Sequence, residues 1–525
     1  MRFAAIFCKN SAPVMNRLQL IAALVCLPLS IAFVDAEPVD PSAHELVADS
    51  LRLMGHRTDI HQINRVRFNA RLVTRDIVEN EHTGEPYPVS VSEAEITEDF
   101  SVGDRLSETR SDSHHLVRDL TVGTAEQFEY FNDAKMVRTR ATLARPGWQI
   151  RNPLRALMLA DRAEDLRREP DAVLHESQQH VVSFSIDGLR VKLFLDARRQ
   201  FISAAEALIG SRQATSSNVA RNAMGDIRER TEFMIWDVGS GMRYPTQWDT
   251  YQNDVLLQTV IITAAPLMNP ARDSSVNLAA ETAQQAARLL STDINQIPLN
   301  SAIWDAPDPH RGIETIAPGV VQIPASWYTT LVAQEDGVVV IDAPISSGYS
   351  ALVIQEATKR FPGLPVKAVI TSTAFFWHIA GVREYAALHI PIYVRDVNES
   401  TVRRILEAPH TLVPDHLSAH PAKAVLRAVS RPTQIGHGKN ALLVMPIALA
   451  AEPMIMTYIA DARLLHTGEM IQPLGPNGSL LFPESLIEVR DTVVQEKLAV
   501  ERLIGMHMSP IEWKDLEAAI ADSGN

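Results

Sequence analysis

Cysteine is nearly missing from this sequence of 525 residues, and its two copies, Cys8 and Cys26, lie close to the N-terminus. The remaining chain therefore offers no disulfide, no thiol nucleophile and no cysteine ligand for zinc. Such a chain suits an oxidising compartment outside the cytoplasm.

Basic charge is also scarce. The 49 Lys and Arg residues stand against 63 Asp and Glu residues, which gives a net charge of −14. Without a long basic run, this balance argues against a nucleic-acid partner. The sequence has no G-x-S-x-G elbow, no P-loop and no G-x-G-x-x-G, so a serine hydrolase or a nucleotide enzyme has no support.

One long apolar run is present, "LQLIAALVCLPLSIAFV" at residues 18–34. Arg17 precedes the run, and "VDA" at Val34–Ala36 closes it with the small-x-small pattern of a signal cleavage site. The run is short for a membrane span, so cleavage is favoured over a retained anchor. Residues 1–36 are thus predicted to be a secretory signal, whether translation starts at Met1 or Met15, and the protein to be secreted or periplasmic without a stable membrane span.

Residues 37–276 are predicted to form a β-rich N-terminal domain, because from about residue 60 to 265 the dominant period is two, typical of antiparallel strands. A hairpin is predicted around Asp187-Gly188, since such a pair suits a two-residue turn. "NPLRALMLADRAEDLRRE", residues 152–169, interrupts the strands and predicts a helix with Asn-Pro at its start. The region is expected to form a curved antiparallel sheet with a helix against it. Residues 277–312 predict a linker helix and loop.

Strands and helices alternate after residue 313, which is typical of sheets covered by helices. Within this part, "VITSTAFFWHIAG" at residues 369–381 runs from an apolar strand into a helix. The stretch resembles the metallo-β-lactamase superfamily, which places a His-x-His-x-Asp-His cluster there. His378 matches the last His of that cluster, and Ala380-Gly381 matches the Gly-Gly that opens the helix.

The resemblance implies an αββα sandwich over residues 313–525, and the β-rich region ahead of it resembles a module of exported family members. It also implies two divalent ions that share a hydroxide nucleophile. Most ligands of that site are replaced here, by Thr373, Phe375, Trp377 and Ala450. His378, Glu469 in place of the bridging Asp, and His507 remain, so the resemblance leaves a metal set of His378, Glu469 and His507.

Several functions stay open at this point. The first is a catalytically degenerate relative of metal-dependent hydrolases with a binding or structural role. The alternative is a hydrolase with one metal ion at the retained set, acting on an ester, thioester or lactam-like substrate. A third function, a binding role of the β-rich region, is compatible with the first. The expected cofactor is none or a single zinc ion, and a small-molecule ligand is possible. His466 is a weaker candidate for a replacement ligand, and the sequence assigns neither a catalytic residue nor an oligomeric state.

The apolar run and its "VDA" end generate a first prediction. The exported protein should begin near Glu37, because signal peptidase cleaves after a small residue that follows the apolar core. N-terminal sequencing of the exported protein checks this, and a chain that still carries residues 18–34 would contradict it.

Overall fold

The computed structural model describes residues 41–77, 86–110, 115–132, 135–210, 223–237, 241–272, 277–299, 312–448, 453–473, 479–480 and 482–522. The predicted signal at residues 1–36 and Ala450 lie outside these ranges. Residues 42–525 form one compact unit of mixed α and β structure with large antiparallel sheets. Within the described part, no helix combines the length and the apolar character that a membrane crossing needs.

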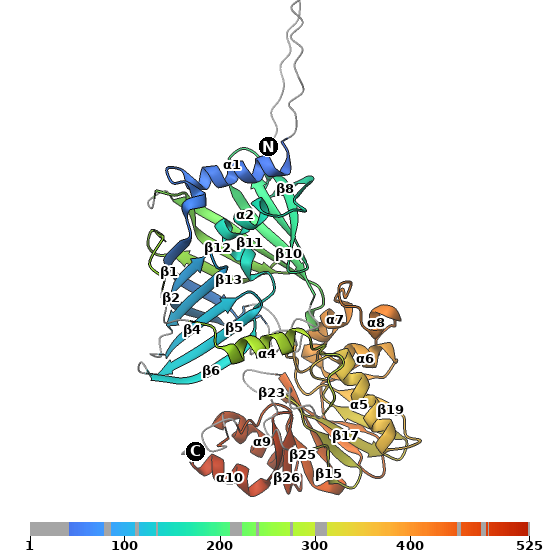
Figure 1. Cartoon of the computed structure of the whole chain (residues 1–525). Coiled ribbons are helices and arrows are strands. Elements are labelled where there is room, and N and C mark those ends of the chain that lie inside the picture. Colours follow the sequence, from blue (N-terminus) through green and yellow to red (C-terminus); the bar gives the residue numbers. More distant parts are fainter. Residues whose placement is uncertain are drawn as a thin grey trace, which may run out of the picture. The chain divides into compact units, whose positions relative to one another are not determined.

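The first part of the chain forms a single antiparallel sheet of 14 strands in the order β6-β5-β4-β3-β2-β1-β13-β12-β11-β10-β9-β8-β7, with β14 beside β1 (Figure 1). Its strands are β1 (Arg65–Arg75), β2 (Val89–Asp99), β3 (Asp104–Arg110), β4 (His115–Val122), β5 (Ala125–Asn132), β6 (Lys135–Leu143), β7 (Arg167–Leu174), β8 (Ser177–Ile186), β9 (Leu189–Asp196), β10 (Ile202–Ile209), β11 (Ile227–Asp237), β12 (Tyr244–Gln252), β13 (Val255–Ile262) and β14 (Leu267–Met268).

Short turns join most of these strands. The hairpin predicted at Asp187-Gly188 is present between β8 and β9, and both residues have positive φ angles, 48° and 77°. A turn of this kind matches the right-handed twist of the flanking strands. The long-range pairing of β1 with β13 then joins the first six strands to the last seven.

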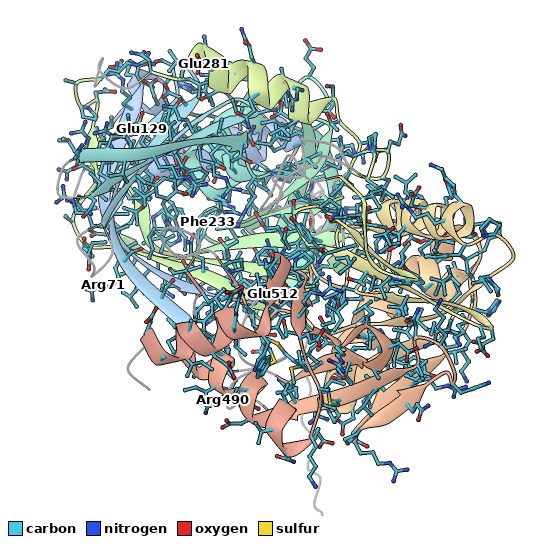
Figure 2. All side chains as sticks on the ribbon, turned by 90° about the horizontal axis from the view of Figure 1, so that it is seen from below. Arg71, Glu129, Phe233, Glu281, Arg490 and Glu512 are labelled. Atoms are coloured by element: carbon cyan, nitrogen blue, oxygen red, sulfur yellow. The ribbon has the colours of Figure 1, made fainter. Side chains whose placement is uncertain are left out.

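Two helices pack on this sheet: α1 (Ala43–Gly55) and α2 (Pro153–Asp161). The side chain of Asn152 caps α2 by accepting hydrogen bonds from the backbone N–H groups of Leu154 and Arg155. The core beneath is aromatic in part, and Phe233 (Figure 2) meets Trp248 edge-on at a centroid distance of 6.4 Å.

The helix predicted over residues 152–169 is too long. It ends at Asp161, and β7 begins at Arg167. The charged end of the segment is drawn into the sheet because Arg168 pairs with Val182, and Glu169 with Val181, on β8. Cross-strand pairing has overridden the helical propensity of these residues.

A helix lies in the predicted linker, α4 (Ala280–Leu290). It covers the end of the sheet beside β5 and β6 (Figure 1). The side-chain oxygen of Gln127 on β5 accepts hydrogen bonds from the Ala279 N–H and the Thr282 hydroxyl. The helix is thus fixed to the sheet rather than free.

Two further sheets follow. The seven-stranded one has the order β15-β16-β17-β18-β19-β20-β21 and the six-stranded one β22-β23-β24-β25-β26-β27. Their strands are β15 (Glu314–Ala317), β16 (Val320–Ile323), β17 (Thr329–Gln334), β18 (Gly337–Ile341), β19 (Val366–Ile370), β20 (Ile392–Arg395), β21 (Leu426–Val429), β22 (Thr433–Ile435), β23 (Leu442–Ala448), β24 (Pro453–Ile459), β25 (Leu464–His466), β26 (Arg502–Gly505) and β27 (Met508–Glu512).

Apolar side chains connect these two sheets. One buried cluster joins Ile341 and Ile370 of the first sheet to Ile455 and Ile504 of the second. Further clusters join the first sheet to α5 (Ser347–Arg360), α6 (Val382–Ala387) and α7 (Glu399–Glu407), and the second sheet to α9 (Pro483–Gln495) and α10 (Trp513–Asp522). The short α8 (His416–Ala419) follows α7.

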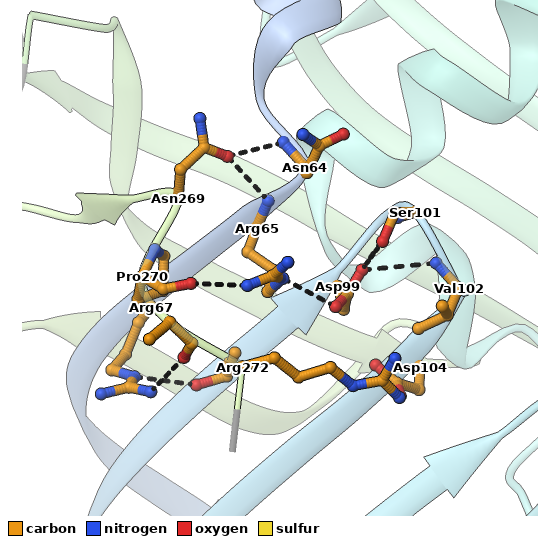
Figure 3. Close-up of polar contacts among 12 residues, drawn as sticks. Asn64, Arg65, Arg67, Asp99, Ser101, Val102, Asp104, Asn269, Pro270 and Arg272 are labelled. Atoms are coloured by element: carbon orange, nitrogen blue, oxygen red, sulfur yellow. Dashed lines mark hydrogen bonds and ion pairs between the residues drawn. The ribbon is translucent and has the colours of Figure 1, made fainter. Parts of the chain in front are cut away.

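A network of polar contacts fixes the start of the large sheet (Figure 3). The buried carboxylate of Asp99 accepts hydrogen bonds from Ser101 N and Oγ and from Val102 N, and its other oxygen lies 2.8 Å from Nε of Arg65. Burial alone would raise the pKa of Asp99, but the bonds from Ser101 and Val102 and the charge of Arg65 hold it below its usual value. The ionised form is therefore the one that stabilises the fold.

This network generates a second prediction. The pKa of Asp99 is lower in the folded chain than the ordinary value of 3.8 that it has in the unfolded chain. The ionised carboxylate therefore stabilises the fold fully at pH values above 3.8, and this stabilisation is lost as the pH falls through the lower pKa of the folded chain. Asp99→Asn should lower the free energy of unfolding at pH 7 by about 1–3 kcal/mol. In denaturant titrations from pH 7 to pH 2.5 the gap to wild type should narrow on acidification, and a constant gap would contradict the role of the charge.

Candidate metal centre

Three loops at strand ends bring the predicted ligands together. His378 lies between β19 and α6, Glu469 follows β25, and His507 stands in the turn between β26 and β27. Since β25 and β26 are parallel neighbours, their following loops emerge at the same edge of the sheet. Gly468 lets the loop after β25 approach the loop after β19, because a Cβ at this position would lie 2.9 Å from the side chain of Ser372. Its φ angle of +62° also favours glycine.

The distances within this group are short. Nδ1 of His378 lies 3.0 Å from Oε2 of Glu469, and Nε2 of His507 lies 3.2 Å from Oε1 of the same carboxylate. One ligand atom from each of the three residues lies within 4.8 Å of the others. The structure therefore places all three residues of the predicted set around one point.

Burial sets the charges in this group. It lowers the pKa of His378, although the neighbouring Glu469 acts in the opposite sense, so the imidazole is neutral near pH 7. For Glu469, burial alone would raise the pKa, but His378 and His507 bring it down to about 2. The pocket thus holds a carboxylate next to a neutral imidazole.

Two buried atoms of the group lack a hydrogen bond. Nδ1 of His378 and Oε2 of Glu469 are close but not aligned for one, and neither has another partner among the described residues. Atoms buried in this way are costly unless something satisfies them. Two ligands of a tetrahedral zinc ion, each about 2.0–2.2 Å from it, lie roughly 3.3–3.6 Å apart, close to the separations seen here. The residues present thus fit a single ion with two His ligands and one Glu ligand.

Aromatic residues surround the group where ligands were expected. Phe375 is buried and its ring lies 5.5 Å from that of His378. Trp377 is half-buried and stacks on Trp327 at a centroid distance of 6.1 Å, and Trp327 also meets His378 edge-on at 5.4 Å. Thr373 is buried, and its hydroxyl accepts a hydrogen bond from Phe375 N. None of these four side chains belongs to the ligand group.

His466 does not join the ligand group either. Its Nδ1 accepts a hydrogen bond from Gly468 N, which leaves the proton on Nε2, 3.6 Å from Oδ2 of Asp342. Burial lowers the pKa of His466 to about 3 and raises that of Asp342 to about 7. Asp342 also accepts a hydrogen bond from Ser372 N at 2.8 Å. Asp342 therefore connects His466 to the loop that follows β19.

Sequence reasoning missed Asp342 and Trp327. Asp342 had a visible signal, since it is a carboxylate directly after the apolar strand "GVVVI", where a buried acid needs a partner. Trp327 had none, because the loop that carries it comes from a hairpin distant in sequence from His378.

Some solved structures are similar to this chain, with low identity and low TM-score. The sequence matches no family model and no curated protein, but the structure is similar to solved metallo-β-lactamases. TMB-1 has 14% identity, 41% of this chain and 100% of that chain covered, and a TM-score of 0.30. The enzyme from Hirschia baltica has 18% identity, with 40% and 97% covered and a TM-score of 0.30.

An inverting sec-alkylsulfatase from Pseudomonas sp., Pisa1, is similar with 16% identity, 40% of each chain covered and a TM-score of 0.30. These solved structures are what the chain is similar to in fold, over about 40% of its length. At these identities and TM-scores, nothing about metal, substrate or residue roles transfers to this chain.

The aromatic packing generates a third prediction. Phe375→Ala should lower the free energy of unfolding by about 3–5 kcal/mol, because it empties a buried ring site. Trp377→Ala should cost less, since that ring is half-exposed. Chemical denaturation of both variants checks the order, and a Phe375→Ala chain as stable as wild type would show that the ring does not pack as described.

Proposed function

We propose that this chain is an exported metallo-β-lactamase-fold protein that binds one zinc ion at His378, Glu469 and His507, as a reduced relative of the metal-dependent hydrolases. The supporting observation is the pair of buried, unsatisfied atoms, His378 Nδ1 and Glu469 Oε2, that face each other beside His507. An ion between them would satisfy both at once. The proposed substrate class is an ester, thioester or lactam-like compound.

The architecture that goes with this proposal is an αββα sandwich over residues 313–525. Its support is the pattern of buried clusters, which lie between the two smaller sheets and between each sheet and its helices. The 14-stranded sheet is then a separate N-terminal module, and residues 1–36 are the signal that exports both.

A bound zinc ion would polarise a carbonyl or lower the pKa of a bound water. The chain's own residues set up the site around it. Glu469 contacts both imidazoles and fixes their orientation. His378, neutral because it is buried, offers a lone pair without prior loss of a proton. The Trp327–Trp377 stack lies beside His378 and limits the access of water on that side.

A second candidate is a non-catalytic protein with a binding or structural role. The observation that supports it is that aromatic residues stand at positions where metal ligands were expected. One of them, Phe375, is buried like a core residue. In that case Glu469 stays in place through its contacts with the two histidines and with the Gln472 amide, and the group is a buried polar cluster. Metal content separates the two candidates.

The fourth prediction follows from this choice. After dialysis against metal-free buffer, the purified protein should retain close to one zinc ion per chain by elemental analysis, and His507→Ala should lose it, because two remaining ligands hold zinc poorly. Removal of the ion by a chelator should lower the melting temperature of wild type, since the ion binds only the folded chain.

The matched control is His437→Ala, a change at an exposed turn after β22 (Thr433–Ile435). It should leave the metal content unchanged. No bound metal in the wild-type chain would decide for the non-catalytic candidate. Two ions per chain would contradict both candidates, since the described part of the chain groups only one set of ligands.

A further inference from the structure

The 14-stranded sheet encloses a cavity of about 380 Å³ that the metal centre does not use. Side chains of β1–β6, β12 and β13 line it, and the segment around Trp148, Arg151 and Asn152 closes one side. Its volume lies in the range of small-molecule sites. Unlike most such sites its wall is rich in charge.

The strand register shows how this wall is built. Glu98 on β2 pairs with Arg105 on β3, Arg105 with Thr121 on β4, and Thr121 with Glu126 on β5. Directly paired residues of an antiparallel sheet point to the same face. The side chains of Glu98, Arg105, Thr121 and Glu126 therefore form one row across four strands.

A second row runs beside the first. Ser107 on β3 pairs with Asp119 on β4, Asp119 with Phe128 on β5, and Phe128 with Arg140 on β6. Asp119 is two residues from Thr121 on the same strand and face. The carboxyl groups of Asp119 and Glu126 are thus diagonal neighbours on adjacent strands.

Much of the remaining wall is fixed by its own contacts. Arg155 holds Glu98 at 2.7 Å, and Arg151 binds Glu229 at 2.6 Å. The indole N–H of Trp148 donates a hydrogen bond to Gly123 O. The cavity is therefore preformed, which lowers the entropic cost of binding a ligand.

Asp119 and Glu126 are members of this wall whose pKa is raised by burial, although Arg105 and Arg145 oppose the rise at both and Arg151 opposes it at Glu126. Asp119 has Arg105 at 4.0 Å and a hydroxyl contact to Thr121 at 3.4 Å. Within the ranges that the structure describes, Glu126 has neither an ion pair nor a side-chain hydrogen bond. Burial and then the charge of Asp119 raise the pKa of Glu126 to about 7, and burial raises that of Asp119. A cationic group placed between them would stabilise both carboxylates.

We propose that this cavity binds a small zwitterionic molecule, with its ammonium group between Asp119 and Glu126 and its anionic group toward the arginines of the wall. Arg105, Arg140, Arg145 and Arg151 all line the cavity. Together they repel a simple cation, whereas a zwitterion offers them an anionic end. Arg140 is exposed on β6, so the anionic end lies toward the solvent side.

Three probes with one carbon skeleton test this proposal: 6-aminohexanoate, hexylamine and hexanoate. In isothermal titration calorimetry of the purified protein at pH 8, 6-aminohexanoate should bind most tightly. Glu126→Gln should weaken its binding roughly tenfold, because one charge-assisted hydrogen bond is lost. Since Gln has nearly the same shape as Glu, the variant should fold, and its melting curve checks that it does.

The matched control is Glu129→Gln on the same strand. Glu129, labelled in Figure 2, is three residues from Glu126, so it points to the other face of the sheet, where it contacts Arg118 at 3.3 Å. It should leave binding unchanged. The proposal is overturned if 6-aminohexanoate does not bind at millimolar concentration, if hexylamine or hexanoate binds as tightly, or if Glu126→Gln and Glu129→Gln weaken binding equally.

Discussion

One buried carboxylate brings together the residues of the candidate metal centre. Glu469 is only 4% exposed, and a charge removed from water in this way must be compensated. The compensation comes from His378 and His507, which belong to loops after β19 and β26. Glu469 itself follows β25, and the Gly468 contact with Ser372 locks its loop against the first. Three loops from two sheets thus meet at one carboxylate.

This constraint explains which of the expected ligands could be replaced. Phe375 lies on the same loop as His378 but is not one of the ligand residues grouped with Glu469. An apolar ring at this position therefore adds buried apolar surface without leaving a buried charge unpaired. Trp377 could take the place of a carboxylate because its ring lies on Trp327, at the edge of the group. Loss of His378 or His507 would instead leave Glu469 buried with one partner. The retained residues are thus those that this carboxylate needs, whether or not an ion joins them.

The family resemblance predicted this group, and its motif positions stand at recognisable strand ends. His378 follows an apolar strand and precedes a helix, and Glu469 and His507 stand at later strand ends, so their convergence follows from the sheet topology. The signal for the Asp187-Gly188 hairpin is local. What failed depends on distant partners: residues 167–169 look helical alone, but β8 recruits them into the sheet. The pairing of β1 with β13 and the approach of His466 to Asp342 likewise have no signal in any short window.

Two glutamates in this chain, Glu469 and Glu126, show how neighbouring groups modify the effect of burial on the pKa of an acid. Burial opposes ionisation of both Glu469 and Glu126. Two histidines reverse the effect at Glu469, whose pKa falls to about 2. At Glu126 burial and then the charge of Asp119 raise the pKa to about 7, although Arg145, Arg105 and Arg151 act in the opposite sense. Glu469 has two imidazoles within 3.2 Å of its carboxylate oxygens, whereas in the described part of the chain Glu126 has no ion pair and is opposed by the charge of Asp119. A cationic group of a bound ligand would therefore stabilise the carboxylates of the N-terminal cavity more than the carboxylate of the candidate metal centre.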